Sequence, residues 1–161
     1  MQAILDRAWS QPTYTSLYAN LCQELARESK IYKVAVVKTV SNEFYISFNE
    51  FYDLIIKLET PGVVFDYEEQ KFEKYMKRKN KLIGNISMIA ELYKNGFLPH
   101  NIIRYICCNL INEMTIYHYK MKEFEKEHDK KFEFSFTEEF VEVLIKLFDL
   151  AGIEMIRKEE K

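Results

Sequence analysis

Glycine and proline are scarce in this sequence of 161 residues, which has four glycines and three prolines. Turn-rich β-sandwiches use more of both residues at their many turns. Hydrophobic residues make up 48% of the chain and aromatic residues 15%, which is enough for one domain with a sizeable core. The composition therefore favours a single helical domain over a β-sandwich.

The sequence also lacks long hydrophobic runs and a strong excess of one charge. No apolar segment approaches the roughly 20 residues that span a bilayer, and the first residues lack the basic start of a signal peptide. The 25 acidic and 23 basic residues give a net charge of −2. Any contact with RNA must therefore come from a local basic patch, and we expect a cytosolic or nuclear protein with no membrane partner.

Catalytic and metal-binding patterns are missing as well. The three cysteines, Cys22, Cys107 and Cys108, lack C-x-x-C spacing, so we expect reduced, buried thiols. The histidines have no cysteine or carboxylate partner at the spacing of a zinc site. Gly84-Asn85 lacks the lysine that follows the glycines of a phosphate-binding loop. We therefore expect no catalytic residues, no metal and no cofactor.

Hydrophobic periodicity predicts about seven helices. Thr13 and Thr137 are candidate N-caps, and Pro99 suits the first position of a helix. The predicted helices cover residues 1–9, 13–25, 48–58, 67–80, 82–93, 99–111 and 137–152, and Asp66 is expected to open the fourth of them. A mixed-charge run, 115–136, reads as a solvated insertion, and residues 157–161 are expected to fray.

The segment 28–47 is the least clear part of the sequence. Val34, Val36, Val37 and Val40 favour a strand, but no second strand-like run is close enough to form a sheet. We interpret this segment as an ordered connection that includes at most a helical turn.

The stretch from Lys77 to Ile111 predicts a helix hairpin joined by Gly96-Phe97-Leu98. Its first helix carries a structural motif, Leu82-Ile83-Gly84-Asn85-Ile86, within an apolar stripe typical of a helix buried on one side. A glycine inside a helix costs about 1 kcal/mol relative to alanine, so Gly84 indicates close approach of a neighbouring backbone. Asn85 is a candidate for a hydrogen bond to that neighbour.

Four basic residues, Lys74, Lys77, Arg78 and Lys81, share one helical face because they lie at i, i+3, i+4 and i+7. Such a strip suits weak contact with RNA phosphates without base specificity. A charged helical face is also commonly just solvated, and both readings stay open at this point.

Short links place helices that are neighbours in sequence next to one another in space. The sequence therefore predicts an all-α fold, an α-solenoid of antiparallel HEAT-like helix pairs. A closed bundle is the alternative.

Three stretches resemble the middle domain of eukaryotic translation initiation factor 4 gamma. They are Tyr18-Ala19-Asn20-Leu21-Cys22, the helix with Phe51-x-x-Leu54-Ile55-Ile56, and the Leu82–Ile86 motif with Glu91-Leu92-Tyr93 and Gly96-Phe97-Leu98. The resemblance covers most of the chain from Ile4 to about Gly152. The family usually begins with a further helix pair before Ile4, so we expect a shortened domain that lacks this pair.

The resemblance implies a cytoplasmic scaffold in cap-dependent translation with no catalysis of its own. It implies binding to the DEAD-box RNA helicase of initiation through Phe51, Leu54 and Lys57, weak contact with RNA, and recruitment of the small-subunit-binding initiation complex. Phe51 and Leu54 fit the core equally well. Related domains occur in nonsense-mediated decay, splicing and nuclear cap binding, so an adaptor of the same fold in one of those pathways is the alternative.

Overall fold

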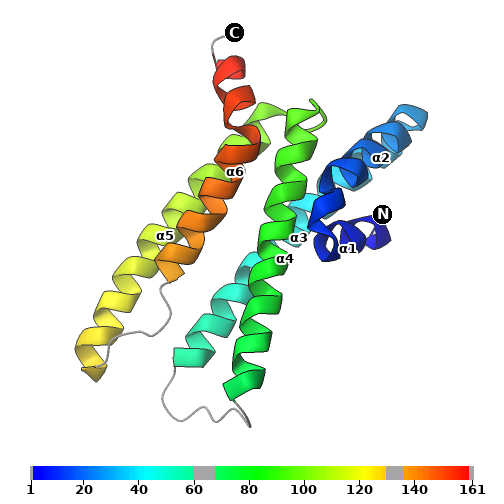
Figure 1. Ribbon diagram of the computed structural model, residues 1–161. Coiled ribbons are helices and arrows are strands. Elements are labelled where there is room, and N and C mark those ends of the chain that lie inside the picture. Colours follow the sequence, from blue (N-terminus) through cyan, green and yellow to red (C-terminus); the bar gives the residue numbers. More distant parts are fainter. Residues whose placement is uncertain (1, 60–67, 130–135, 160–161) are drawn as a thin grey trace.

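The computed structural model describes residues 2–59, 68–129 and 136–159, and every regular element in these ranges is helical (Figure 1). The elements are α1 Gln2–Ser10, a 3-10 turn η1 Pro12–Tyr14, α2 Thr15–Glu28, α3 Lys30–Glu59, α4 Glu68–Lys94, α5 His100–His128 and α6 Phe136–Glu159. The predicted all-α class is confirmed. Within the described ranges, no helix is long and apolar enough to cross a membrane.

The predicted connection at 28–47 is wrong, because this segment is helical from Lys30 onward and continues without a break to Glu59. Val36, Val40 and Phe44 lie four residues apart and are buried, so they form one stripe along the helix. The preference of valine for strands is weak, and burial of this stripe overrides it.

Several predicted helices are joined into longer ones. The helices predicted at 67–80 and 82–93 form the single helix α4, and α5 continues from 99–111 into the charged run as far as His128. Lys120, Lys122 and Lys126 of that run are exposed. The described chain therefore has six α-helices instead of about seven.

The predicted turn after α4 is present. Gly96 has a φ of +72°, in the left-handed region, and the Phe97 amide donates a hydrogen bond of 2.8 Å to the Leu92 carbonyl. This arrangement ends a helix and is most easily adopted by glycine. Pro99 lies at the N-cap of α5, one residue before the first helical residue.

Both predicted threonine caps are wrong. The Tyr14 amide bonds the Gln11 carbonyl at 3.0 Å, so Thr13 lies in the 3-10 turn, and α2 begins at Thr15 without a side-chain cap. Thr137 follows the first residue of α6, Phe136. Neither threonine therefore occupies the N-cap position of the helix that it was predicted to cap.

The last helix is longer than predicted, because α6 continues past Gly152 to Glu159. Lys158 lies in the segment expected to fray, yet its ammonium is 4.0 Å from the centre of the Tyr93 ring. The expected helix start at Asp66 lies outside the described residues, as do residues 160–161.

Helix α4 is at the centre of the molecule. It packs against α1, α2, α3 and α6, and it stands between α2 and α6 in Figure 1. All residues from Gly84 to Tyr93 are buried, so this half of α4 is enclosed on every side and not on one face as predicted. Leu82, at 1% exposure, and Ile86, at 0%, belong to this core.

Asn85 joins α4 to α3. Its side-chain amide donates hydrogen bonds to the Glu43 carbonyl at 3.2 Å and to the Ser47 hydroxyl at 2.7 Å. The Ser47 hydroxyl in turn donates to the Glu43 carbonyl at 2.8 Å. The predicted hydrogen bond from Asn85 to a neighbouring backbone is therefore present, and it fixes the register between α3 and α4.

Gly84 allows α1 to reach α4. A Cβ atom added at Gly84 would lie 3.1 Å from the Cα of Trp9 and 3.4 Å from its Cβ. Real Cβ contacts are rarely so short. The close approach of a neighbouring backbone predicted at Gly84 is thus made by α1.

We predict that Gly84→Val displaces α1 and lowers the free energy of unfolding by about 1–3 kcal/mol, since the added methyl groups overpack the contact with Trp9. Trp9 is the one tryptophan in the chain, so its fluorescence reports this contact directly. Emission should shift to longer wavelength, and the midpoint of thermal unfolding should fall.

Gly152→Ala is the matched control for this experiment. A Cβ at Gly152 would meet its nearest neighbour, Phe148, at 3.8 Å, an ordinary contact. This variant should gain about 0.5–1 kcal/mol from the higher helix propensity of alanine, with unchanged Trp9 emission. Unchanged emission and stability in Gly84→Val would contradict the role assigned to Gly84.

Candidate functional site

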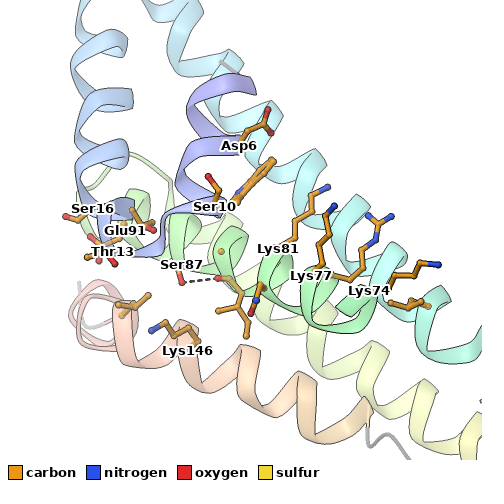
Figure 2. A pocket seen from close by; sticks show the side chains of 18 residues that line it. Asp6, Ser10, Thr13, Ser16, Lys74, Lys77, Lys81, Ser87, Glu91 and Lys146 are labelled. Atoms are coloured by element: carbon orange, nitrogen blue, oxygen red, sulfur yellow. Dashed lines mark hydrogen bonds between the residues drawn. The ribbon is translucent and has the colours of Figure 1, made fainter. Parts of the chain in front are cut away.

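A groove of about 1130 Å³ runs along α4, with α1 on one side and α6 on the other (Figure 2). We call it the α4 groove. Its wall from α1 includes Asp6, Trp9 and Ser10, and its wall from α6 includes Lys146 and Leu150. The close approach at Gly84 sets the position of the α1 wall, because Gly84 and Trp9 both line the groove.

The groove is positively charged although the chain is not. Its charged lining consists of five cations and two carboxylates, namely Lys74, Lys77, Arg78, Lys81 and Lys146 against Asp6 and Glu91. The hydroxyl groups of Thr13 and Ser16 also line it, while those of Ser10 and Ser87 donate to the backbone carbonyls of Arg7 and Ile83. The arrangement suits a ligand with several negative charges.

The four cations predicted as a basic strip all line this groove, and Figure 2 shows three of them, Lys74, Lys77 and Lys81, in a row along α4. Lys74 and Lys77 are exposed. The structure therefore places all four residues of the predicted strip in the lining of one groove.

The other two cations of the strip are already engaged by α3. Arg78 forms an ion pair with Glu50, and the ammonium of Lys81 lies 3.5 Å from Glu43 and 3.6 Å from Glu50. Lys81 also lies 5.5 Å from the centre of the Trp9 ring. These contacts partly neutralise both side chains, whereas Lys77 is exposed on the same helix.

Sequence reasoning missed Lys146 and Trp9. Lys146 is the cation that α6 contributes to the lining of the groove, and Figure 2 shows it on the α6 side, across from α4. A lysine between apolar residues of α6 carries no sign of its partner helix, so only the fold could place it there. Trp9 shares the helical spacing of Ile4, Leu5 and Ala8, and this pattern indicates an apolar helix face but no groove.

The three residues expected at a helicase contact fall in different environments. Phe51 is 1% exposed, and its ring packs against Tyr75 with centroids 5.6 Å apart. Leu54 is half-buried and lines the α4 groove, while Lys57 is exposed. The structure therefore places Phe51 in the core and leaves Lys57, with part of Leu54, on the surface.

The thiols divide into two classes. Cys22 and Cys107 are buried as predicted, but Cys108 is exposed, because neighbouring residues on a helix face different directions. Burial raises the pKa of the Cys22 thiol to about 11. The pKa of the Cys107 thiol is also raised to about 11, mainly by burial and to a smaller extent by the neighbouring Cys108. Among the described residues, no group of three or more potential ligands could hold a metal ion.

Comparison with known proteins gives one relationship in sequence. No protein-family model matches the chain, and no solved structure matches it. The chain is 33% identical over 119 residues to eukaryotic translation initiation factor 4G of Cucumis melo. It is related to a region of that initiation factor. The match covers 68% of this chain but only 6% of the melon protein, so it concerns a small part of the relative.

We predict that a disulfide reagent modifies one thiol quickly at about pH 8 and the other two only on unfolding, because the thiolate is the reactive form. Cys108→Ser should remove the fast phase, and Cys22→Ser should leave it unchanged.

The folded-state pKa of Cys22, about 11, lies above that of an unfolded thiol, so ionisation of this thiol opposes folding. Its contribution to stability should be complete below about pH 8.5 and lost as the pH rises through 11. Rapid modification of Cys22 would contradict this assignment.

Proposed function

We propose that this chain is a scaffold module of the translation initiation machinery and has no catalytic activity. The similarity to factor 4G over 119 residues carries this proposal. The helical structure and the absence of a metal-ligand cluster in its described part are compatible with a protein that acts by binding. Its place within such a factor is proposed to be the HEAT-like middle domain.

The packing order supports a solenoid arrangement. Helices α3 and α4 pack together, as do α5 and α6, and the second helices of these two pairs, α4 and α6, contact each other. From α2 to α6, consecutive helices run in opposite directions in Figure 1. This packing order supports the proposal that the pairs stack as in an array of HEAT-like repeats, with α4 in contact with α6 of the next pair.

We also propose that the α4 groove binds single-stranded RNA through its phosphates. The observation that carries this proposal is the gathering of five cations from α4 and α6 on a chain whose net charge is −2. Its lining presents lysine and hydroxyl groups, which suit phosphate oxygens, so the contact is independent of base sequence.

Lys74→Glu with Lys77→Glu should weaken binding of a labelled oligouridylate of about 20 nucleotides by about tenfold or more. Each phosphate contact contributes about −0.7 to the slope of log affinity against log salt, so the slope should become less steep by about 1.4. Fluorescence anisotropy at several salt concentrations measures both quantities.

Lys120→Glu with Lys126→Glu is the matched control, since both lysines are exposed on a helix away from the groove lining. This variant has the same net charge as the groove variant. An equal loss of affinity in both variants, or no loss in either, would reject the groove as the RNA site.

The helicase contact is proposed for the exposed surface at Lys57 and the adjacent part of Leu54. Phe51 supports this surface from within the core and does not itself provide a contact, because its side chain is buried. A surface that holds a helicase needs no reacting groups, only a rigid shape, and the continuous helix α3 supplies this.

Titration of the chain against the initiation DEAD-box helicase should raise its ATPase rate to a plateau. Lys57→Glu should increase the half-maximal concentration about two- to fivefold, the effect of one exposed charge. Phe51→Ala should instead lower the free energy of unfolding by about 3–5 kcal/mol. Lys126→Glu serves as the control for Lys57→Glu. Absence of ATPase stimulation, with binding only to decay or splicing proteins, would favour the alternative pathways.

A further inference from the structure

A second recess lies on a different part of the surface, where the first turns of α3 meet the turn between α4 and α5. It has a volume of about 490 Å³. We call it the α3–α5 notch. Its apolar lining comes from Val34 and Val37 of α3, Phe97 and Pro99 of the turn, and Ile102 of α5. A recess of this size lies within the range of about 300–1,000 Å³ typical of ligand sites.

The notch has a closed base and an exposed apolar edge. Phe97 is 4% exposed, and Val37 and Ile102 are half-buried against the core, so the base is part of the packed interior. Val34, in contrast, is 66% exposed, and Ile31, one turn earlier on the same helix, is 77% exposed. Val34 and Ile31 therefore extend the apolar lining of the notch onto the exposed surface of α3, where a partner could cover them.

The charges around the notch all have one sign. Among the described residues that line it, the only charged ones are Lys33 and Lys38, and both are exposed. The ammonium of Lys33 lies 5.6 Å from the centre of the Phe97 ring, so one cation lies over the apolar base itself. A positive edge around an apolar base excludes a basic or purely polar ligand.

The start of α5 adds to this positive potential. Pro99, which lines the notch, is the N-cap of α5, and it provides no side-chain hydrogen bond to the first amides of that helix. The first turn of α5 contains no acidic residue, and neither does the first turn of α3. The partial positive charge of the α5 terminus is therefore not compensated by its own first-turn side chains.

We propose that the α3–α5 notch binds an acidic segment of a partner protein that carries a large apolar side chain. The apolar side chain enters between Val34 and Phe97. Flanking carboxylates pair with Lys33 and Lys38, and one of them lies at the start of α5. This site shares no lining residue with the α4 groove, so it is independent of the proposed RNA contact.

The test uses a fluorescein-labelled peptide of about 12 residues in which glutamates surround a central leucine-phenylalanine pair. Binding followed by anisotropy should saturate, and methyl NMR signals of Val34, Val37 and Ile102 should shift most. Lys33→Glu with Lys38→Glu should weaken binding about tenfold or more, and Val34→Ser should weaken it severalfold. All three side chains are exposed, so these variants should keep the helical circular dichroism of the parent.

Two control peptides and one control variant make the outcome decisive. A peptide with lysine in place of glutamate, and one with serine in place of the apolar pair, should each bind at least tenfold more weakly. Lys120→Glu with Lys126→Glu should not change peptide affinity, and Lys33→Glu with Lys38→Glu should not change RNA affinity.

Equal binding of the three peptides, or equal weakening by the two double variants, would overturn the proposal. So would a lack of saturation. A concentration-dependent dimer that Val34→Ser dissociates would assign the notch to a second copy of this chain instead. If the unmodified chain binds the peptide but not RNA, the RNA site proposed for the α4 groove would be refuted, and the proposal for the notch would stand.

Discussion

Burial of α4 on all sides is the constraint on which the other helix positions depend. The ten residues from Gly84 to Tyr93 are all buried, and a helix can be enclosed in this way only when neighbours cover its whole circumference. Helices α1, α2, α3 and α6 supply that cover. Three of them meet a different residue of α4: Gly84 where α1 approaches, Asn85 where α3 approaches, and Tyr93 where the end of α6 approaches.

These contacts differ in how specifically they fix the packing. An apolar contact tolerates small shifts along the helix, whereas the bond from Asn85 to the Glu43 carbonyl is made at one register only. The Tyr93 hydroxyl likewise lies 2.8 Å from His100 Nδ1 and donates to the Glu154 carbonyl at 3.3 Å, so it joins α4, α5 and α6. Polar groups inside the core thus select one arrangement among many that would bury similar apolar area.

Sequence predicted the class of the fold and the hairpin at Gly96, because these depend on local signals such as composition, periodicity and a glycine at a helix end. It did not predict that 28–47 is helix. The signal was available: Val36, Val40, Phe44 and Phe48 form a four-residue repeat, and Phe51 follows three residues later on the same face. The strand propensity of the valines pointed to a different structure, but propensity is the weaker effect when a helix can bury a full apolar stripe. The caps at Thr13 and Thr137 failed for a related reason, since the packing of the following helices set their first residues.

The candidate groove shows where sequence reasoning reaches its limit. Lys74, Lys77, Arg78 and Lys81 share a face of one helix, and helical spacing alone is enough to group them. Lys146 joins them from α6, and its approach depends on how α4 and α6 pack, which no local pattern encodes. Spacing also could not show that Glu43 and Glu50 of α3 engage two of the four cations. A basic strip read from sequence therefore gives the sign of the charge correctly but overstates how much of it is available to a ligand. The long-range partners of each side chain decide the rest.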